Sequence, residues 1–458
     1  MFKWSTNNII DATGGRDVNG CNWIHSSNIS TDTRSIKKGD LFIALKGKNF
    51  DGHNFLHEAF LKGAAAAIVS EGKYKNFPLV IVQDTLKALH DTASYYIRNV
   101  LVDAKVIAIT GSVGKTTTKD MLHTVLSQYG VSHANEGNLN NNIGLPLTIL
   151  KAPKNCQYLI LEMGMNKVGE IKELSKISNP NIAVITNIEP AHTENFSSLF
   201  DVAQAKLEIL YGTKNNGTLV LNRDNKYYDY LSSHANKNVI SFGKDKNAEV
   251  CLLDIIRNDD GLNLKIRLSN NQTINCNLRV QGEHFAYSLL AIVAVVQNLG
   301  LDLSKLPLAL KNFSVAKGRG NIHKVKYNRK YIHLIDDSYN ASPTSMKTAI
   351  KTLSTYSNQR KVALLGDMLE LGDESIEFHT DLVKIITGNN IDKVYTVGKF
   401  MLELHELLPD NIRGAHFNDS NQLKSNLANI IQNNDAILVK GSRGMKMDLI
   451  VREFIIEY

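Results

Sequence analysis

The sequence predicts an α/β protein with three domains in series. The chain has 458 residues, and a single hydrophobic core stops growing beyond about 250–300 residues, so several domains are expected. Short apolar runs of strand length alternate with stretches of helical length. This alternation is typical of parallel sheets covered by helices. From the changes in pattern we expect domains at 1–103, 104–312 and 313–458.

The composition indicates a soluble globular protein. Hydrophobic residues make up 43% and charged residues 21% of the chain, which is the balance of folded domains and not of disordered ones. The sequence has no apolar run long enough to span a bilayer, and residues 1–8 lack the apolar core of a signal peptide. The four cysteines, at 21, 156, 251 and 276, have neither metal-ligand spacing nor a secreted-type framework. We therefore expect a cytoplasmic protein without a membrane segment.

The net charge of +7 comes from 52 lysines and arginines against 45 acidic residues. The basic residues are scattered, without a basic run interleaved with aromatic residues, which argues against a nucleic-acid partner. Small anionic substrates such as nucleotides would benefit from the same surplus. A solvated basic surface is the simplest interpretation for most of these lysines.

The predicted elements follow in order along the chain. The first domain has strands at 41–45, 66–69 and 79–82 and a helix at 85–100. The second domain has strands at 106–110, 158–162, 182–187 and 217–221, with helices at 201–211 and 284–299. The third domain has strands at 332–335, 362–365, 393–397 and 436–440, with helices between them. In such parallel sheets, sites are expected at the carboxyl ends of the strands.

The stretch "VIAITGSVGKTTTKDM", residues 106–121, predicts a phosphate-binding loop. A strand precedes it, a helix follows it, glycines allow close backbone approach, and a lysine is available to meet negative charge. Ile109 stands where the usual loop has its first glycine, so the loop is shortened. The structural alternative is an ordinary turn with threonines capping the helix. The residues predicted to bind the phosphates are Gly111, Ser112, Val113, Gly114, Lys115, Thr116 and Thr117.

Polar residues follow the next two strands of the same domain. Glu162 ends one buried strand, and Asn187 and His192 follow another. A buried carboxylate is costly unless a cation meets it. Read singly, Glu162 is a helix cap and His192 a structural histidine. Together with the Thr116 hydroxyl, at the edge where parallel strands end, they predict a Mg-ATP site.

Several stretches resemble the Mur ligases of peptidoglycan precursor synthesis. The shortened loop itself, "NLNNNIGLP" (138–146), "LEMGMN", "ITNIEPAH" and "AQAKLEIL" (203–210) all match that family. The resemblance covers the whole chain. It implies a small N-terminal α/β domain that binds UDP, a central P-loop-type ATPase domain with a mainly parallel sheet, and a C-terminal Rossmann-like α/β domain. It also implies an amide ligase that uses ATP to form an acyl phosphate.

The resemblance assigns roles to the central residues. Lys115 meets the phosphates, Thr116 and Glu162 hold one magnesium ion, and His192 helps to hold a second. Lys206, in "AKLE", matches a lysine that is carbamylated by CO2 and thereby becomes an anionic ligand. Read alone, Lys206 is an ordinary helix lysine. The resemblance also places Asn142 and His284 in the nucleotide site.

The outer domains indicate the step that is catalysed. "LIDDSYNASPTSM" (334–346) resembles the member that adds D-alanyl-D-alanine to a UDP-N-acetylmuramoyl-tripeptide. By this resemblance Arg319 and Asp337 approach the ATP, and Tyr339 and Asn340 lie near the dipeptide. "STDTRSIKKGDLFIALKGKNFDGHNF" resembles the UDP-binding segment, and arginine with loop N–H groups suits a diphosphate. The residues expected near the nucleotide sugar are Thr33, Arg34, Gly47, Asp51, Gly52 and His53.

The chain departs from the family at two places, and alternatives stay open. Thr33 replaces a commoner serine, a mild change that keeps the hydroxyl. In the adenine-contacting stretch G-x-H-N-x-x-N, Phe285 and Ser288 replace the two asparagines. The alternatives are the preceding ligase of the series, although its D-N-P-R motif is absent from the sequence, and a relative similar to folylpolyglutamate synthase. A nucleotide switch that ligates nothing is the alternative from another class. We expect a monomer.

Overall fold

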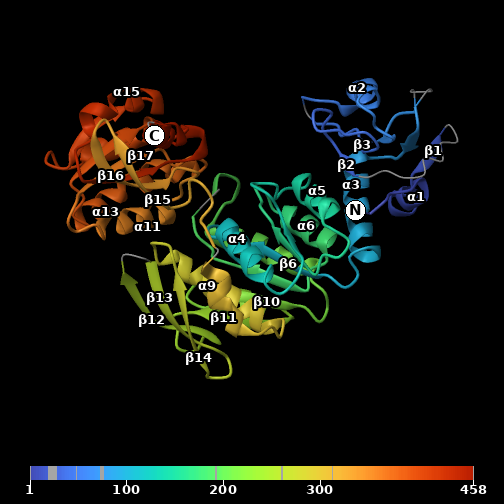
Figure 1. Cartoon of the computed structure of the whole chain (residues 1–458), viewed down its shortest axis with the longest axis horizontal. Helices are drawn as coiled ribbons and strands as arrows, with labels where there is room; N and C mark the ends of the chain where they lie inside the picture. The colour runs from blue at the N-terminus through green and yellow to red at the C-terminus, as the bar shows by residue number, and fades with distance from the viewer. Residues whose placement is uncertain are drawn as a thin grey trace.

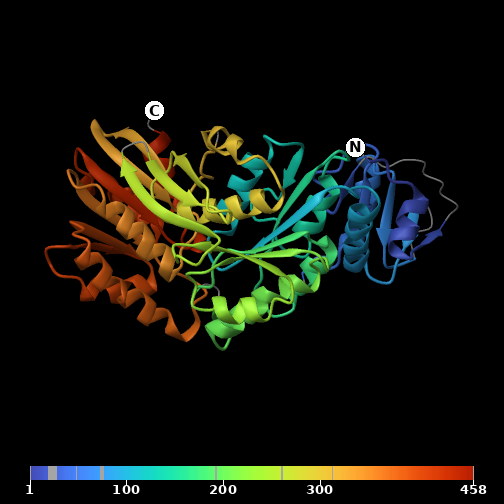
Figure 2. The ribbon, with the colours of Figure 1, turned by 90° about the horizontal axis from the view of Figure 1, so that it is seen from below.

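The computed structural model describes residues 2–18, 28–47, 49–72, 77–190, 193–258, 261–311 and 313–456. Three bodies lie in a row, with the N-terminal part at one end, the C-terminal part at the other and the largest between them (Figure 1, Figure 2). Each body has its own sheet. The predicted three-domain α/β class is confirmed.

The N-terminal domain is a small sheet with helices packed on it. Its elements are α1 (Thr6–Thr13), β1 (Arg16–Val18), β2 (Ile29–Ser30), β3 (Leu41–Ile43), η1 (Gly52–Phe55), α2 (Leu56–Leu61), β4 (Ala66–Val69), β5 (Leu79–Ile81) and α3 (Thr85–Asn99). The strand order is β1-β5-β4-β3-β2, with β1 antiparallel and the others parallel. Helix α3 starts where the Asp84 carboxylate accepts hydrogen bonds from the Leu86 and Lys87 N–H groups, a typical N-cap.

The central domain carries the longest sheet. Its elements are β6 (Lys105–Thr110), α4 (Lys115–Leu126), β7 (Ser132–Ala134), α5 (Gly144–Lys151), β8 (Tyr158–Glu162), α6 (Glu170–Ser178), β9 (Ile182–Ile185), η2 (Thr193–Asn195), α7 (Leu199–Leu207), η3 (Glu208–Tyr211), β10 (Thr218–Asn222), α8 (Tyr228–Ser233), β11 (Asn238–Gly243), β12 (Val250–Asn258), β13 (Gly261–Arg267), β14 (Thr273–Leu278), α9 (His284–Asn298), η4 (Leu303–Lys305) and α10 (Leu306–Lys311). The strand order is β14-β13-β12-β11-β10-β9-β6-β8-β7. Strand β6 therefore lies between β8 and β9, and the loops after these three strands meet at one edge.

The end of this sheet differs from the sequence-based expectation. Strands β12, β13 and β14 pair antiparallel, and none of them was predicted. Two of them carry polar residues among the apolar ones, such as Asn263 and Lys265 in β13 and Asn275 in β14. An antiparallel strand with one face toward solvent alternates in this way and lacks the continuous apolar run of a buried parallel strand. A pattern of apolar runs therefore does not predict this part of the sheet.

The C-terminal domain is again mostly parallel. Its elements are β15 (Asn321–Tyr327), β16 (Lys330–Asp337), α11 (Pro343–Ser354), β17 (Arg360–Gly366), η5 (Gly372–Glu374), α12 (Ser375–Thr380), α13 (Leu382–Gly388), β18 (Lys393–Val397), α14 (Lys399–Leu407), β19 (Arg413–Phe417), α15 (Ser420–Ile430), β20 (Asp435–Lys440), η6 (Arg443–Met445) and α16 (Asp448–Ile456). The order is β15-β16-β20-β17-β18-β19, and only β15 runs antiparallel to its neighbour. Helix α11 begins at Ser342, whose hydroxyl accepts from the Ser345 N–H, and Pro343 occupies the first turn.

The loops that carry most of the predicted site residues lie at the junction of the central and C-terminal domains. The loops after β6, β8 and β9 and the start of α9 face the start of α11 and the loop after β20 across a cleft. Among the residues that the structure describes, no helix is both long and apolar enough to cross a bilayer.

Candidate active site

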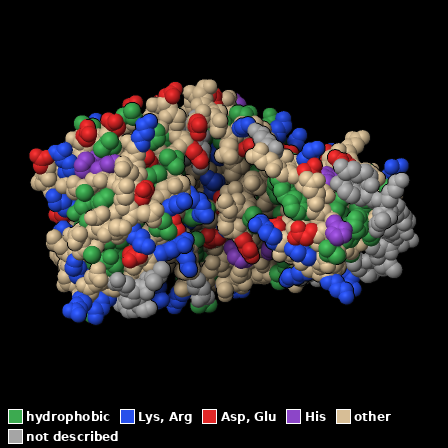
Figure 3. All heavy atoms as spheres, turned by 90° about the horizontal axis from the view of Figure 1, so that it is seen from above, with side chains coloured by type: hydrophobic (Ala, Val, Ile, Leu, Met, Phe, Trp, Pro, Cys, Tyr) green, Lys and Arg blue, Asp and Glu red, His purple; other side chains and the backbone are tan. Residues whose placement is uncertain are grey.

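The cleft between the central and C-terminal domains has a volume of about 1630 Å³. In the space-filling view the molecule is hollowed near its middle, and basic side chains gather beside the hollow (Figure 3). The phosphate loop, Glu162, Asn187, Lys206 and His284 line this cleft from the central domain. Arg319, Asp337, Tyr339 and Asn340 line it as well, and so does Asn142, so the structure brings these predicted residues together.

The shortened loop is held tightly against the end of β9. Gly111 has φ +144°, and a Cβ there would lie 2.1 Å from the Thr186 hydroxyl oxygen. The Thr186 N–H donates to the Thr110 carbonyl at 2.9 Å, and the Thr186 hydroxyl donates to the Val113 carbonyl at 2.6 Å. Gly114, with φ +83°, is the N-cap of α4, and no side chain caps this helix. The N–H groups at the start of α4 are therefore free to meet an anion, and the alternative of capping threonines does not hold.

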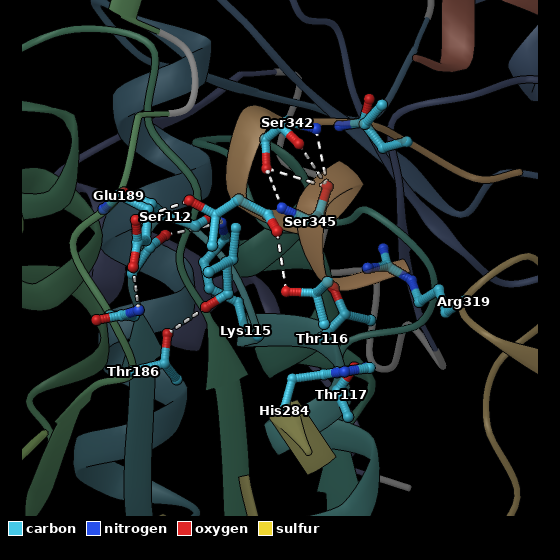
Figure 4. Close-up of a pocket in the computed structure, with 18 of the residues that line it drawn as sticks. Ser112, Lys115, Thr116, Thr117, Thr186, Glu189, His284, Arg319, Ser342 and Ser345 are labelled. Atoms are coloured by element: carbon cyan, nitrogen blue, oxygen red, sulfur yellow. Dashed lines mark hydrogen bonds between the residues drawn. The ribbon is translucent and has the colours of Figure 1, made fainter. Parts of the chain in front are cut away.

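Lys115 lies folded over this loop. Its ammonium donates to the carbonyl oxygens of Gly111 at 2.8 Å and of Ser112 at 3.0 Å. Burial lowers the pKa of Lys115 from its ordinary value, although the nearby Glu162 carboxylate acts in the opposite direction. In Figure 4 Lys115 lies between Ser112 and Thr116, and Arg319 lies to one side. The lysine is thus positioned beside the N–H groups that a phosphate would meet.

Glu162 ends β8 with an incomplete set of hydrogen bonds. Glu162 is buried, with 2% of the residue exposed. Oε1 accepts from the Asn140 amide at 2.7 Å, whereas Oε2 is buried and has no hydrogen-bond partner among the described residues. An unsatisfied carboxylate oxygen is costly in the interior, and a divalent cation would satisfy it. Thr116, 8% exposed, presents its hydroxyl from the first turn of α4 to the same cleft. This donor set fits a magnesium ion.

Lys206 is a buried lysine near the end of α7. It is 4% exposed and makes no hydrogen bond or ion pair with the described residues. Burial lowers its pKa well below the ordinary lysine value, and the positive charge of Lys115 adds to this effect. A neutral amine is thereby favoured at this position. His192, the third predicted metal ligand, lies outside the described residues. Among those that are described, no three His, Cys, Asp or Glu side chains cluster as a metal site.

Glu189 connects the nucleotide loop with the C-terminal domain; it lies in the "ITNIEPAH" stretch but was not among the predicted site residues. Its N–H donates to the Ser112 hydroxyl at 3.1 Å, and its Oε1 accepts from the Asn187 amide at 2.7 Å. Its Oε2 accepts from the hydroxyl of Thr344, in the first turn of α11, at 2.8 Å. Figure 4 shows Glu189 and Ser112 on one side of Lys115, with Ser342 and Ser345 of the C-terminal domain above. The two walls of the cleft are therefore joined directly.

An ion pair and a stacked arginine form the C-terminal wall. The Lys440 ammonium, with a side chain 2% exposed, donates to Asp337 Oδ2 at 2.7 Å. Burial raises the pKa of Asp337, and the neighbouring Lys440 partly opposes this rise. The Arg319 guanidinium lies 4.1 Å from the centre of the Tyr339 ring, within cation–π range. Lys440 ends β20, and the sequence does not indicate that Asp337, 103 residues away, is its partner.

His284 opens α9 on the central side of the cleft. The surrounding protein and the charge of Lys440 lower the pKa of its imidazole to about 4, so the ring is neutral at pH 7. Phe285, in place of an asparagine, is completely buried. Ser288, in place of the second asparagine, accepts a hydrogen bond from the Thr118 hydroxyl at 3.1 Å and thus ties α9 to α4.

The predicted UDP-binding residues lie in the N-terminal domain and do not line this cleft. Arg34 pairs with Asp32 at 2.6 Å, and this pairing lowers the pKa of Asp32 to about 2. His53 is buried; its Nδ1 lies 2.6 Å from Asp51 Oδ1, and its Nε2 accepts from the Ser70 N–H at 2.9 Å. These contacts hold the buried His53, whereas the Arg34 side chain remains exposed to solvent. The other predicted residues of this group also lie in the N-terminal domain; they are Thr33, Gly47 and Gly52.

Comparisons with known proteins match the chain in three successive segments. Residues 25–108 match the Mur ligase family, catalytic domain; residues 109–296 match the Mur ligase middle domain; residues 318–443 match the Mur ligase, glutamate ligase domain.

Curated relatives match over almost the full length. The UDP-N-acetylmuramoyl-tripeptide–D-alanyl-D-alanine ligase of Buchnera aphidicola subsp. Baizongia pistaciae is 40% identical over 440 residues, 95% of this chain and 93% of the relative. The enzyme of the same name from Bacillus subtilis is 37% identical and covers 99% of both chains.

Solved structures agree with these matches. MurF from Acinetobacter baumannii superposes with a TM-score of 0.91 at 31% identity, covering 100% of this chain and 99% of that one. MurF from Thermotoga maritima in complex with ADP superposes with a TM-score of 0.83 at 28% identity, covering 94% and 98%. The three domains, the cleft between two of them and these matches show that the chain belongs to the Mur ligase family.

Proposed function

We propose that this chain is the ATP-dependent ligase that joins D-alanyl-D-alanine to a UDP-N-acetylmuramoyl-tripeptide during peptidoglycan precursor synthesis. The observation that carries the proposal is the alignment over 95% or more of the chain with relatives that bear this activity in their names. The cleft supports it, because a phosphate loop, an unpaired carboxylate and a buried lysine lie together between two domains. Substrates from different domains can meet there.

The reaction has two steps. The tripeptide carboxylate attacks the terminal phosphorus of ATP, which gives an acyl phosphate and ADP. The amine of the dipeptide then attacks the acyl carbon, and phosphate leaves through a tetrahedral intermediate with loss of a proton. Negative charge builds up on the transferring phosphoryl group, so the site must supply positive charge and N–H donors. Lys115 and the start of α4 provide both.

Thr116 and Glu162 would hold one magnesium ion, and His192 would help to hold a second. The unsatisfied Oε2 of Glu162 supports the first assignment. When bound, the metal supplies positive charge to the phosphates. Among this chain's own groups, the Asn140 amide orients the Glu162 carboxylate from the opposite side at 2.7 Å. Lys115 stays within reach of the same phosphates.

Lys206 would carry a carbamate. Its neutral amine adds to the carbon of CO2 and loses a proton, which gives an N-carboxylate. The low exposure and the lowered pKa of Lys206 support this reaction, since only an unprotonated amine adds to CO2. The product would be an anionic group beside the metals.

The outer residues would bind the remaining substrate groups. The phosphates would be surrounded by Gly111, Ser112, Val113, Gly114 and Thr117. The rest of the nucleotide site would be formed by Asn142, His284, Arg319 and Asp337. Tyr339 and Asn340 lie near the dipeptide. The nucleotide sugar binds to the N-terminal domain at Thr33, Arg34, Gly47, Asp51, Gly52 and His53. The enzyme acts as a cytoplasmic monomer.

An acceptor panel tests the proposal. The protein is incubated with ATP, Mg2+ and either UDP-N-acetylmuramoyl-tripeptide or the corresponding UDP-dipeptide, together with D-alanyl-D-alanine, a single amino acid or no acceptor. Released phosphate and new UDP-peptide are measured. We expect product only with the dipeptide. Product formation with a single amino acid on the UDP-dipeptide would identify the preceding ligase instead. Phosphate release that ignores every peptide would indicate a nucleotide switch.

A further inference from the structure

His90 reaches from the N-terminal domain to the loop that precedes α5. It lies on α3 and is 7% exposed. Its Nε2 lies 2.6 Å from the carbonyl oxygen of Asn142, and its Nδ1 lies 3.3 Å from Glu173 Oε1 on α6. A carbonyl oxygen only accepts hydrogen bonds, so Nε2 must carry the hydrogen. The imidazole therefore donates to the backbone of the central domain.

The loop that receives this hydrogen bond also contacts the proposed metal ligand. We refer to residues 135–143 as the asparagine loop, since five of its nine residues are asparagine. The Asn140 amide donates to Glu162 Oε1 at 2.7 Å, and the Asn140 carbonyl accepts from the Gly164 N–H at 2.9 Å. Asn142 is two residues further along. One short segment thus joins His90 to the carboxylate whose second oxygen has no partner in the described part of the chain.

We infer that His90 is a positioning residue for the metal site: through the asparagine loop, it holds the Asn140 amide against Glu162 and so aims Oε2 into the cleft. This inference rests on the role of Glu162 in the proposed function. It assigns the N-terminal domain a part in organising the ATP site, in addition to binding the nucleotide sugar.

The domains do not need His90 in order to pack together. Helix α3 buries Ala88, Leu89, Ala93 and Tyr96, and the Tyr96 hydroxyl donates to the Ala152 carbonyl at 2.7 Å. These contacts attach α3 to the central domain independently of the imidazole. A substitution of His90 should therefore change the loop more than the docking of the domain.

Two substitutions separate the contacts of the ring. In His90→Gln the side-chain amide nitrogen replaces Nε2, so the bond to the Asn142 carbonyl is kept. In His90→Asn the shorter amide reaches only the Nδ1 position, so that bond is lost. His57→Asn, at an exposed histidine of the same domain, is the matched control, and Glu162→Gln is the reference for loss of the metal ligand.

The measurement is the Mg2+ concentration needed for half-maximal binding of a fluorescent ADP, together with the melting temperature, on the full chain without peptide substrates. We expect His90→Asn to raise this concentration about tenfold, the effect of one lost buried hydrogen bond, and to leave the melting temperature within a few degrees. His90→Gln and His57→Asn should stay within about twofold of wild type.

Either of two results would overturn the inference: a wild-type Mg2+ requirement in His90→Asn, or equal damage in His90→Gln and His90→Asn. Failure of the proposed function is visible separately. An unchanged Mg2+ requirement in Glu162→Gln would show that Glu162 does not bind the metal. Absence of ligation in the acceptor panel would refute the proposed reaction, and the binding measurement does not depend on that reaction.

Discussion

Replacing Lys206 by methionine should make the protein more stable while it abolishes turnover. The side chain is 4% exposed and burial lowers the pKa of its amine, and taking a polar group out of water without full compensation costs about 1–3 kcal/mol in mutational data. Methionine has a similar length and no such cost. A gain of about 2 kcal/mol corresponds to a rise of roughly 4–8 °C in melting temperature for a domain of the size of the central one.

The pH dependence of this gain has a definite sign. Burial lowers the pKa of Lys206 in the folded protein, so below the pKa of the unfolded chain, 10.5, folding must expel a proton or bury a charge. This cost is largest at low pH and disappears as the pH rises above that value. Methionine does not ionise. The stability advantage of Lys206→Met should therefore be larger at pH 6.5 than at pH 9.5.

The assay is thermal and urea unfolding of both proteins in CO2-free buffer, where the lysine stays unmodified, with ligation measured in parallel. Lys176→Met, at an exposed lysine of α6, is the control and should change neither quantity. A variant that is less stable than wild type at pH 6.5, or an advantage that does not shrink with pH, would refute a buried, neutral amine. Retained turnover would refute the carbamate.

Three further outcomes are expected. Lys115→Ala should abolish ligation with an unchanged circular dichroism spectrum, because we propose that its ammonium meets the phosphates, and its own hydrogen bonds are confined to the loop; near-normal activity would remove it from the mechanism. Gly111→Ala should abolish nucleotide binding and cost about 1–3 kcal/mol of stability, since its Cβ would lie 2.1 Å from the Thr186 hydroxyl oxygen; both are measured by titration and melting. Asp337→Ala leaves the buried Lys440 ammonium without its carboxylate and should destabilise the C-terminal domain by about 3–5 kcal/mol in urea unfolding; no change would show that the pair is not stabilising.

The sequence by itself determined the positions of several strands and helices. It also determined the chemistry of the phosphate loop. The strands predicted at 158–162 and 393–397 are confirmed at the same residues, because the buried positions of both parallel strands are mostly apolar. The helix predicted at 201–211 proved to be α7 followed by the short turn η3. The glycines and lysine of the phosphate loop are likewise local, since the turn needs them within a few residues of each other.

Only the tertiary structure decided which polar groups meet. The bond of Thr344 to Glu189 joins residues 155 positions apart, and the pair of Lys440 with Asp337 joins residues 103 positions apart. Periodicity records which face of a strand or helix is buried, but it does not record which distant residue lies opposite. The docking of His90 on the asparagine loop and the unsatisfied oxygen of Glu162 depend on strand order and domain packing, and these arise only when the whole chain is folded.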